Sequence, residues 1–551
     1  MEPALRGPMK FLAVRVLLLC ALLPVVAGLA GTVPFDTAAW RELFKTPGLV
    51  QSLTLSIWTG SVASVLALAL AHGVLAAAVT DGWSGRLRAA SLPLLATPHL
   101  AVGIGLTLVL APSGLLLRFL SPWATGFTQP PDWATIQDPL GLAMILGLVI
   151  KEAPFLLLAL FAALGQVPAE RLVLQTRTLG YGRLKGWLVA VAPLLQRQIR
   201  LPVAAVLVFG MTNVEMALPL GPRTPPPLAL VLWQWFTSAD LDMRPLAMAG
   251  SVLLMLASLG TFGLFMLAGR LVGRVWRSSA GSGRRVASVS GGLMAGGLSI
   301  VVGTLGLASI VALLLRSTAG PWRFPAALPE HLDPVAWSSA LSVLPGVAGL
   351  TLALGAATAL LAVLLVLAAA EPLRSDAVSR QRVAVLLFVP LLIPQMSFLF
   401  GLQILLLKLR LDGTLAAVVW SHLVFALPYV WGFLAEARAS LDPRLTNTAR
   451  LLGAGRLRVW LTVTAPLLLR STLLALALAF GVSVALYLPT LFAGGGRVAT
   501  LATSAAAAMT AGDMRYAAAH GAAQALLPLT AFMVAVVLGR VAFRHRRGVP
   551  G

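Results

Sequence analysis

The 551-residue chain is 58% hydrophobic and only 11% charged, and its mean hydropathy is +0.90. So few polar side chains cannot cover the surface of a water-soluble globule of this size. The composition therefore excludes a soluble protein and predicts an all-α integral membrane protein.

Apolar runs near 20 residues, the length of a helix that crosses roughly 30 Å of hydrocarbon, recur along the whole chain. We expect about twelve membrane-spanning helices, six in each half of the sequence. They are placed near residues 11–30, 50–79, 90–111, 140–165, 201–220, 246–269, 292–315, 340–370, 383–407, 413–435, 471–492 and 522–543.

The net charge of +22 is distributed in a way that indicates topology rather than nucleic-acid binding. If residue 1 is cytoplasmic and twelve spans alternate, the cytoplasmic side collects 29 of the 41 Lys and Arg residues but only 7 of the 19 acidic residues. This is the positive-inside bias that orients membrane helices. We therefore expect both termini in the cytoplasm, with lipid and not nucleic acid as a partner. Residues 1–30 also have the pattern of a signal peptide, but the repeat described next favours their retention as the first span.

A 17-residue segment occurs twice, each time in a basic gap between apolar runs. The first copy, LGYGRLKGWLVAVAPLL, covers Leu179–Leu195, and the second, LGAGRLRVWLTVTAPLL, covers Leu452–Leu468. Eleven positions are identical, whereas composition alone would give about one or two. The copies are 273 residues apart, which is half the chain.

Weaker matches extend the repeat over both halves. Pro93-Leu94-Leu95 corresponds to Pro390-Leu391-Leu392, and Phe209-Gly210 corresponds to Phe480-Gly481. We infer two diverged copies of one six-span unit, residues 1–285 and 286–551. Because each copy has an even number of spans, the two halves are parallel and related by an axis along the membrane normal.

The repeated segment predicts a pair of short helices in each half. Helices are expected over residues 171–177 and 444–450, and Gly180 and Gly453 end them as C-terminal breakers. A second helix follows each glycine, with an apolar and aromatic face and a basic flank. The two tryptophans of these helices, Trp187 and Trp460, are expected to pack each loop against the membrane domain.

This loop resembles the EAA motif of permease subunits of binding-protein-dependent ABC importers, whose pattern is roughly Glu-Ala-Ala, three further residues, Gly and a later Pro. The whole chain is similar to fused double permeases of the iron(III), thiamine and YnjC-like group. The resemblance implies a type I ABC importer permease fold in a bacterial inner membrane, two copies of a separate ATPase subunit and a periplasmic substrate-binding protein. The residues that it implies for coupling to the ATPase are Arg177, Gly180, Gly182, Arg183, Arg450, Gly453, Gly455 and Arg456.

The sequence departs from that motif at its acidic position. The glutamate of the motif is replaced by Leu174 in the first loop and by Asn447 in the second. Any salt bridge that the glutamate would make is therefore lost, while Arg177 and Arg450 remain close to the two glycines.

Four polar residues interrupt the expected spans of the first half. Lys151 and Glu152 lie in the fourth span, and Asn213 and Glu215 lie in the fifth. A charge at the centre of the bilayer costs about 2.5–3.5 kcal/mol, so such residues usually face a cavity or one another. They are our candidates for the translocation path, with a structural pair between Lys151 and Glu215 as the alternative. Further polar lining could come from His99, Gln395, Gln403 and His422, although each alone fits a packing residue better.

The sequence contains no Walker A motif, no HExxH motif and a single cysteine, Cys20. We therefore expect a transport permease with no catalytic residues, no metal site and no cofactor, and ATP hydrolysis on a partner subunit.

The main competing function is a 12-span secondary transporter driven by an ion gradient, which also has parallel halves. Such proteins carry a Gly…Asp-Arg-x-Gly-Arg-Arg sequence between spans two and three. The segment Asp81-Gly82-Trp83-Ser84-Gly85-Arg86 lies there but lacks the arginine after Asp81. A membrane enzyme or an assembly scaffold would show catalytic residues or a soluble module, and neither is visible.

Overall fold

The computed structural model describes residues 11–33, 37–79, 91, 94–165, 167–196, 198–281, 290–333, 337 and 344–543. Within these ranges the regular structure is helical, with one isolated bridge between Ala319 and Leu332. Among the described residues, ten helices are long and apolar enough to span a membrane, or up to twelve if each of two bent helix pairs is one span. The all-α expectation is confirmed, and the expected twelve spans match the larger of these two numbers.

The first half of the chain alternates membrane-length helices with short ones and ends in the long helix α15 (Met243–Gly281). The helices described before α15 are α2 (Leu12–Thr32), α3 (Thr37–Lys45), α4 (Leu49–Ala78), α6 (His99–Leu110), α7 (Leu115–Leu120), α8 (Leu142–Leu164), α9 (Ala169–Thr178), α10 (Arg183–Gly186), η1 (Trp187–Val191), α11 (Ala192–Leu195), α12 (Arg200–Thr212), α13 (Val214–Leu220) and α14 (Leu228–Thr237).

The second half follows the same order, without counterparts of α3 and α7 among its described helices. Its helices are α16 (Ser290–Thr318), α18 (Leu344–Ala370), α19 (Ala377–Phe388), η2 (Val389–Leu392), α20 (Gln395–Lys408), α21 (Leu415–Ser440), α22 (Pro443–Leu451), α23 (Arg456–Val459), η3 (Trp460–Thr464), α24 (Ala465–Ala485), α25 (Leu488–Ala493), α26 (Leu501–Thr510) and α27 (Met514–Phe543).

The repeat extends to individual hydrogen bonds. Helix α14 begins at Leu228, whose N–H donates to Ser56 Oγ on α4 at 2.8 Å. Helix α26 begins at Leu501, whose N–H donates to Thr351 Oγ1 on α18 at 3.0 Å. Each bond satisfies one of the free N–H groups at a helix start inside an apolar body. Equivalent helices of the two halves thus begin with the same kind of hydrogen bond, which supports a common six-helix unit. The proposed boundary between residues 285 and 286 lies outside the described residues.

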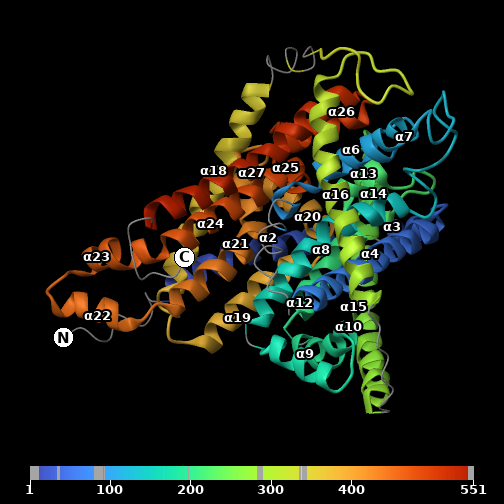
Figure 1. The fold of residues 1–551 in the computed structure, drawn as a ribbon. Helices are drawn as coiled ribbons and strands as arrows, with labels where there is room; N and C mark the ends of the chain where they lie inside the picture. The colour runs from blue at the N-terminus through green and yellow to red at the C-terminus, as the bar shows by residue number, and fades with distance from the viewer. Residues whose placement is uncertain are drawn as a thin grey trace.

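The first helix of each half packs against the other half. Helix α2 lies along α20, and α16 lies along α6, so the exchange is reciprocal (Figure 1). Three rings add to the contact between halves: Phe236 of α14 stacks on Phe400 of α20 with centroids 4.2 Å apart, and both meet Phe492 of α25. The two repeats are therefore intertwined in space.

The crossing of α2 and α20 is close enough to require glycine. Gly401 on α20 faces Gly28 and Gly31 on α2, and its N–H donates to Thr32 Oγ1 at 2.9 Å. A Cβ at Gly401 would overlap the carbonyl oxygen of Gly28 and would lie 2.6 Å from the nitrogen of Thr32. Small residues let helix backbones approach in this way, and van der Waals packing then holds them together.

Both repeated loops lie at the same end of the molecule. At the opposite end, the Arg118 side chain donates to the backbone of Trp322, Arg323 and Ala326, which places the loops before α8 and before α18 together. From that end, α8 runs across the molecule to α9 in the first loop. Helix α18 runs in the same direction to Glu371, which accepts two hydrogen bonds from Arg438 at the end of α21, just before α22 in the second loop.

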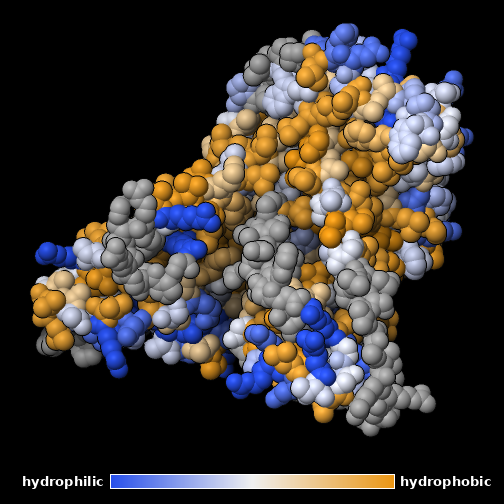
Figure 2. All heavy atoms as spheres, in the orientation of Figure 1, coloured by the Kyte–Doolittle hydropathy of each residue, from blue (hydrophilic) through white to orange (hydrophobic). Residues whose placement is uncertain are grey.

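The surface agrees with a chain that crosses a bilayer. Apolar side chains cover the body of the molecule, and hydrophilic ones gather around α7 at one end and around the α9 and α22 regions at the other (Figure 2). Both expected loops are thus in the polar part of the surface, away from the apolar belt.

The glycine crossing gives a stability prediction. We expect Gly401→Ala to lower the free energy of unfolding by about 1–3 kcal/mol, because the added methyl group forces the backbones of α2 and α20 apart. The measurement is the melting temperature of the purified protein in detergent. Gly303→Ala on α16 is the matched control, since a Cβ there meets no atom within 4 Å; an equal loss in both variants would contradict the prediction.

Candidate coupling loops and central cavity

The first repeated loop is a helix, a glycine turn and a second helix. Helix α9 ends at Thr178, and Gly180 follows with φ of +84°, which a residue with a Cβ rarely adopts. The N–H of Tyr181 donates to the carbonyl of Thr176 at 3.0 Å, and that of Gly180 to Arg177 at 2.9 Å. This pair of bonds is a Schellman motif, which satisfies the last carbonyls of α9 and turns the chain into α10.

The second loop has the same backbone. Gly453 also has φ of +84°, the N–H of Ala454 donates to Ala449 at 3.1 Å, and that of Gly453 to Arg450 at 3.0 Å. The expected glycine turns between two helices are confirmed in both halves. Gly182 and Gly455 occupy the N-cap positions of α10 and α23 with ordinary extended φ values of −65° and −64°, so they are not needed for their backbone freedom.

The two loops differ in how they meet the rest of the protein. Trp187 is fully buried, and its Nε1–H donates to His72 Nδ1 on α4 at 3.0 Å. Its counterpart Trp460 is 40% exposed, and Leu457 beside it is 72% exposed. The expected packing against the membrane domain is found for Trp187, whereas Trp460, which begins η3, is only partly buried.

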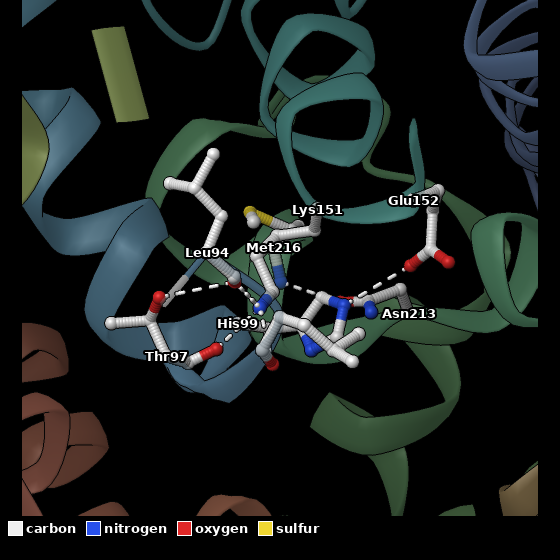
Figure 3. A network of polar contacts seen from close by, with 8 residues as sticks. Leu94, Thr97, His99, Lys151, Glu152, Asn213 and Met216 are labelled. Carbon is white, nitrogen blue, oxygen red and sulfur yellow. Dashed lines mark hydrogen bonds and ion pairs between the residues drawn. The ribbon is translucent and has the colours of Figure 1, made fainter. Parts of the chain in front are cut away.

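The first polar cluster satisfies a break in the third span. Pro98 has no N–H, so the carbonyl of Leu94 four residues earlier loses its helical partner. The ammonium of Lys151 on α8 donates to that carbonyl at 2.6 Å, to the carbonyl of Leu95 at 3.2 Å and to the carbonyl of Thr97 (Figure 3). Lys151 therefore replaces the backbone bonds that the break removes.

The second break lies between α12 and α13. The side-chain oxygen of Asn213 accepts from the N–H of Met216 at 2.6 Å and so caps α13 (Figure 3). Glu215, on the first turn of α13, accepts from the N–H of Tyr487 at 3.4 Å, at the equivalent break between α24 and α25 of the other half. The expected pair of Lys151 with Glu215 is not formed, because each is engaged by backbone at a different break.

Glu152 is hydrogen-bonded to a residue of the third span. Its Oε1 lies 3.1 Å from Nε2 of His99, and the Glu152 side chain is only 8% exposed (Figure 3). The His99 ring meets Phe209 on α12 edge-on, with centroids 4.8 Å apart. Three elements of the first half, α6, α8 and α12, are thus joined at this point.

These groups line a cavity of about 180 Å³ between the two halves. The first half contributes His99, Lys151, Glu152 and Glu215, which are polar, and the second half contributes Gln395 and Tyr429. Among the residues expected on the translocation path, Lys151, Glu152 and Glu215 line the cavity, whereas Asn213 caps the helix beside it.

The second half contributes a histidine and two hydroxyl groups at its break between α24 and α25. Pro428 in α21 matches Pro154 in α8, so Phe425 stands where the first half has Lys151. His422, one turn earlier, lies 2.7 Å from Ser483 Oγ and 2.9 Å from Thr490 Oγ1, on the two sides of the break between α24 and α25. His422 is therefore a packing residue, as the sequence favoured.

With this geometry established, comparison with known proteins identifies the family. The inner membrane ABC transporter permease protein YnjC of Escherichia coli strain K12 is 31% identical over 516 residues, which cover 93% of this chain and 92% of the relative. The chain is an ABC transporter permease. It is a multi-pass protein of the inner membrane and a transport subunit, a class in which the ATPase is a separate part. Membership of this family decides against the secondary transporter, whose candidate motif at residues 81–86 lies outside the described residues.

Two further comparisons add nothing to this assignment. No protein-family model matches the permease. A crystal structure of a mutant of the Vibrio cholerae MATE transporter VcmN aligns over 93% of this chain and 99% of that one with 14% identity and a TM-score of 0.13, from which no fold likeness follows.

Sequence reasoning missed part of the cavity of the permease. Tyr429 carried no signal, because an aromatic residue in an apolar run is most often part of the core. His99 and Gln395 were visible as polar residues, and their shared position directly after Pro98 and Pro394 was the signal that they occupy equivalent places in the two halves.

The two tryptophans give a matched pair of variants of the permease. We expect Trp187→Ala to lower the free energy of unfolding by about 3–5 kcal/mol, because it empties a fully buried site. Trp460→Ala should cost much less, since the side chain is partly exposed already. Thermal melts of both variants in detergent measure the difference, and equal melting temperatures would contradict it.

The role of Lys151 gives a second prediction. Lys151→Met leaves carbonyls at the Pro98 break without a donor, which costs about 1–3 kcal/mol for each buried group left unpaired. Phe425→Met, at the equivalent place in the second half, is the control and should cost under about 1.5 kcal/mol. Adding Glu215→Gln to Lys151→Met should not restore the melting temperature; a clear recovery would mean that the two charges act as a pair after all.

Proposed function

We propose that this permease forms the translocation path of an importer for a small solute and is driven by two copies of a separate ATPase subunit, one on each repeated loop. A periplasmic substrate-binding protein delivers the solute to the opposite end. The observation that carries the proposal is the pair of loops with one backbone, a left-handed glycine between two short helices, at one end of two intertwined halves.

The loops have the surface that such coupling needs. Arg177, Arg450 and Arg456 are exposed, as are Leu451 and Leu452 at 88% and 81%. An exposed apolar tip with a basic flank is typical of a surface that a partner covers. In this proposal the loops lie in the cytoplasm with both termini, in agreement with the excess of Lys and Arg on that side.

The position of the cavity supports a path. It lies between the halves, next to all four interrupted helices, and irregular backbone at membrane depth is tolerated only where protein buries it or a water-filled cavity meets it. Relative motion of the halves would expose the cavity to one side and then to the other. We also infer that the permease has the type I importer fold and that the residues of both loops couple it to the ATPase.

The test replaces the two turn glycines together. Gly180→Val with Gly453→Val should abolish co-purification of the ATPase and ATP-driven uptake, because valine disfavours φ of +84° and distorts the tip of both loops. Membrane insertion should persist, since the spans are unchanged.

Gly512→Val is the control for this test. Gly512 has φ of +82° in the turn between α26 and α27, at the end away from the loops, and a Cβ there meets no atom within 4 Å. The control should retain the ATPase. Normal co-purification and uptake in the double valine variant would overturn the coupling role of the loops.

A further inference from the structure

The positive charge in the cavity is fully engaged. An ammonium has three N–H donors, and Lys151 gives its donors to the carbonyls of Leu94, Leu95 and Thr97. Lys151 is the one Lys or Arg among the described residues that line the cavity, and its side chain is 2% exposed. An anionic solute would therefore meet no free cationic donor from these residues.

The negative charges are only partly engaged. Glu152 uses Oε1 for His99, and Glu215 uses Oε1 for the N–H of Tyr487. The second oxygen of each carboxylate makes no hydrogen bond to the described residues, although both glutamates are more than nine-tenths buried and line the cavity. Figure 3 shows the free oxygen of Glu152 turned away from His99. The lining thus holds two carboxyl groups, each with one oxygen that has no partner among the described residues, and one ammonium that is engaged by three carbonyls.

The remaining wall is largely aromatic. The rings that line the cavity are Phe155, Phe209, Phe425, Tyr429 and Phe532. Ring faces attract cations, most strongly where water is excluded. The volume of 180 Å³ is of the same order as the engineered apolar cavity of about 150 Å³ that holds benzene. The space thus fits a solute with about one ring.

A metal ion fits this lining less well. Hard cations prefer six or more oxygen ligands, and transition metals prefer clusters of imidazole, thiolate or carboxylate. Within the described ranges no group of three His, Cys, Asp or Glu side chains could hold a metal ion. Two separated carboxylates among aromatic rings instead suit a weakly hydrated charge spread over an organic group.

We infer that the central cavity binds a small organic cation of about one ring, with its charge near Glu152 and Glu215 and its apolar part against the aromatic rings. This inference rests on the proposed function, since it gives the substrate class of the same path. Lys151 is then a positioning residue that holds the broken third span, and it does not touch the solute.

The test is equilibrium binding to the full-length permease in detergent, measured by titration calorimetry. The probe is benzyltrimethylammonium, and its matched anion is phenylmethanesulfonate, which has the same ring and linker. We expect the cation to bind and the anion not to bind. Glu152→Gln and Glu215→Gln should each weaken binding of the cation about tenfold, whereas Glu330→Gln, in an exposed loop away from the cavity, should leave it unchanged.

Melting temperatures and one further variant keep the test valid if a glutamate variant misfolds. Melting temperatures identify any glutamate variant that does not fold, and Tyr429→Leu then replaces it, with weaker cation binding expected from loss of the ring. The inference is overturned if the permease binds the sulfonate as tightly as the cation, if it binds neither probe, or if the folded variants bind the cation like the unchanged protein.

The same preparation separates the two proposals. If the ATPase co-purifies and the cation does not bind, the substrate class is wrong while the coupling proposal stands. If the cation binds and no ATPase is retained, the cavity is a cation site and the coupling proposal fails.

Discussion

An interrupted helix inside a membrane must find partners for the backbone groups that it frees, because hydrocarbon offers none. This permease has four such interruptions around one cavity, at Pro98, Asn213, Pro394 and Leu486. Lys151 supplies donors at the first, and Asn213 caps the helix after the second. Lys151 and Asn213 therefore hold broken backbone in place, and the shape of the cavity depends on them.

The two halves are also intertwined at these interrupted helices. The first helix of each half packs against the helix that follows a proline break of the other half, α2 against α20 and α16 against α6. The crossing at Gly28 and Gly401 is close because small residues permit backbone contact, and it ties α2 to α20 through the Thr32 hydroxyl. Movement of one half against the other must then carry a helix of the partner half with it.

The two halves share a backbone plan and differ in chemistry. The break between α12 and α13 is capped by the amide of Asn213, whereas its counterpart between α24 and α25 is bridged by His422 with two hydroxyl groups. One loop is anchored by the buried Trp187, and the other lacks a matching contact with α18 and leaves Trp460 partly exposed. Both copies keep the same backbone path, but different side chains can bond the backbone groups that a break frees. The side chains of duplicated units can therefore diverge while the fold is kept.

The sequence by itself determined the membrane class, the helical spans, the twofold repeat and both glycine turns, because these follow from apolar run length, from identity between copies and from the left-handed conformation that glycine permits. It also located the polar residues inside the spans. Only the tertiary structure decided their partners: Lys151 bonds carbonyls of the third span, and Glu215 reaches Tyr487 in the other half. Neighbouring spans in the chain suggested a pair of Lys151 with Glu215, but partners are set by which backbone groups the packed helices bring within reach, and that depends on contacts between halves far apart in sequence.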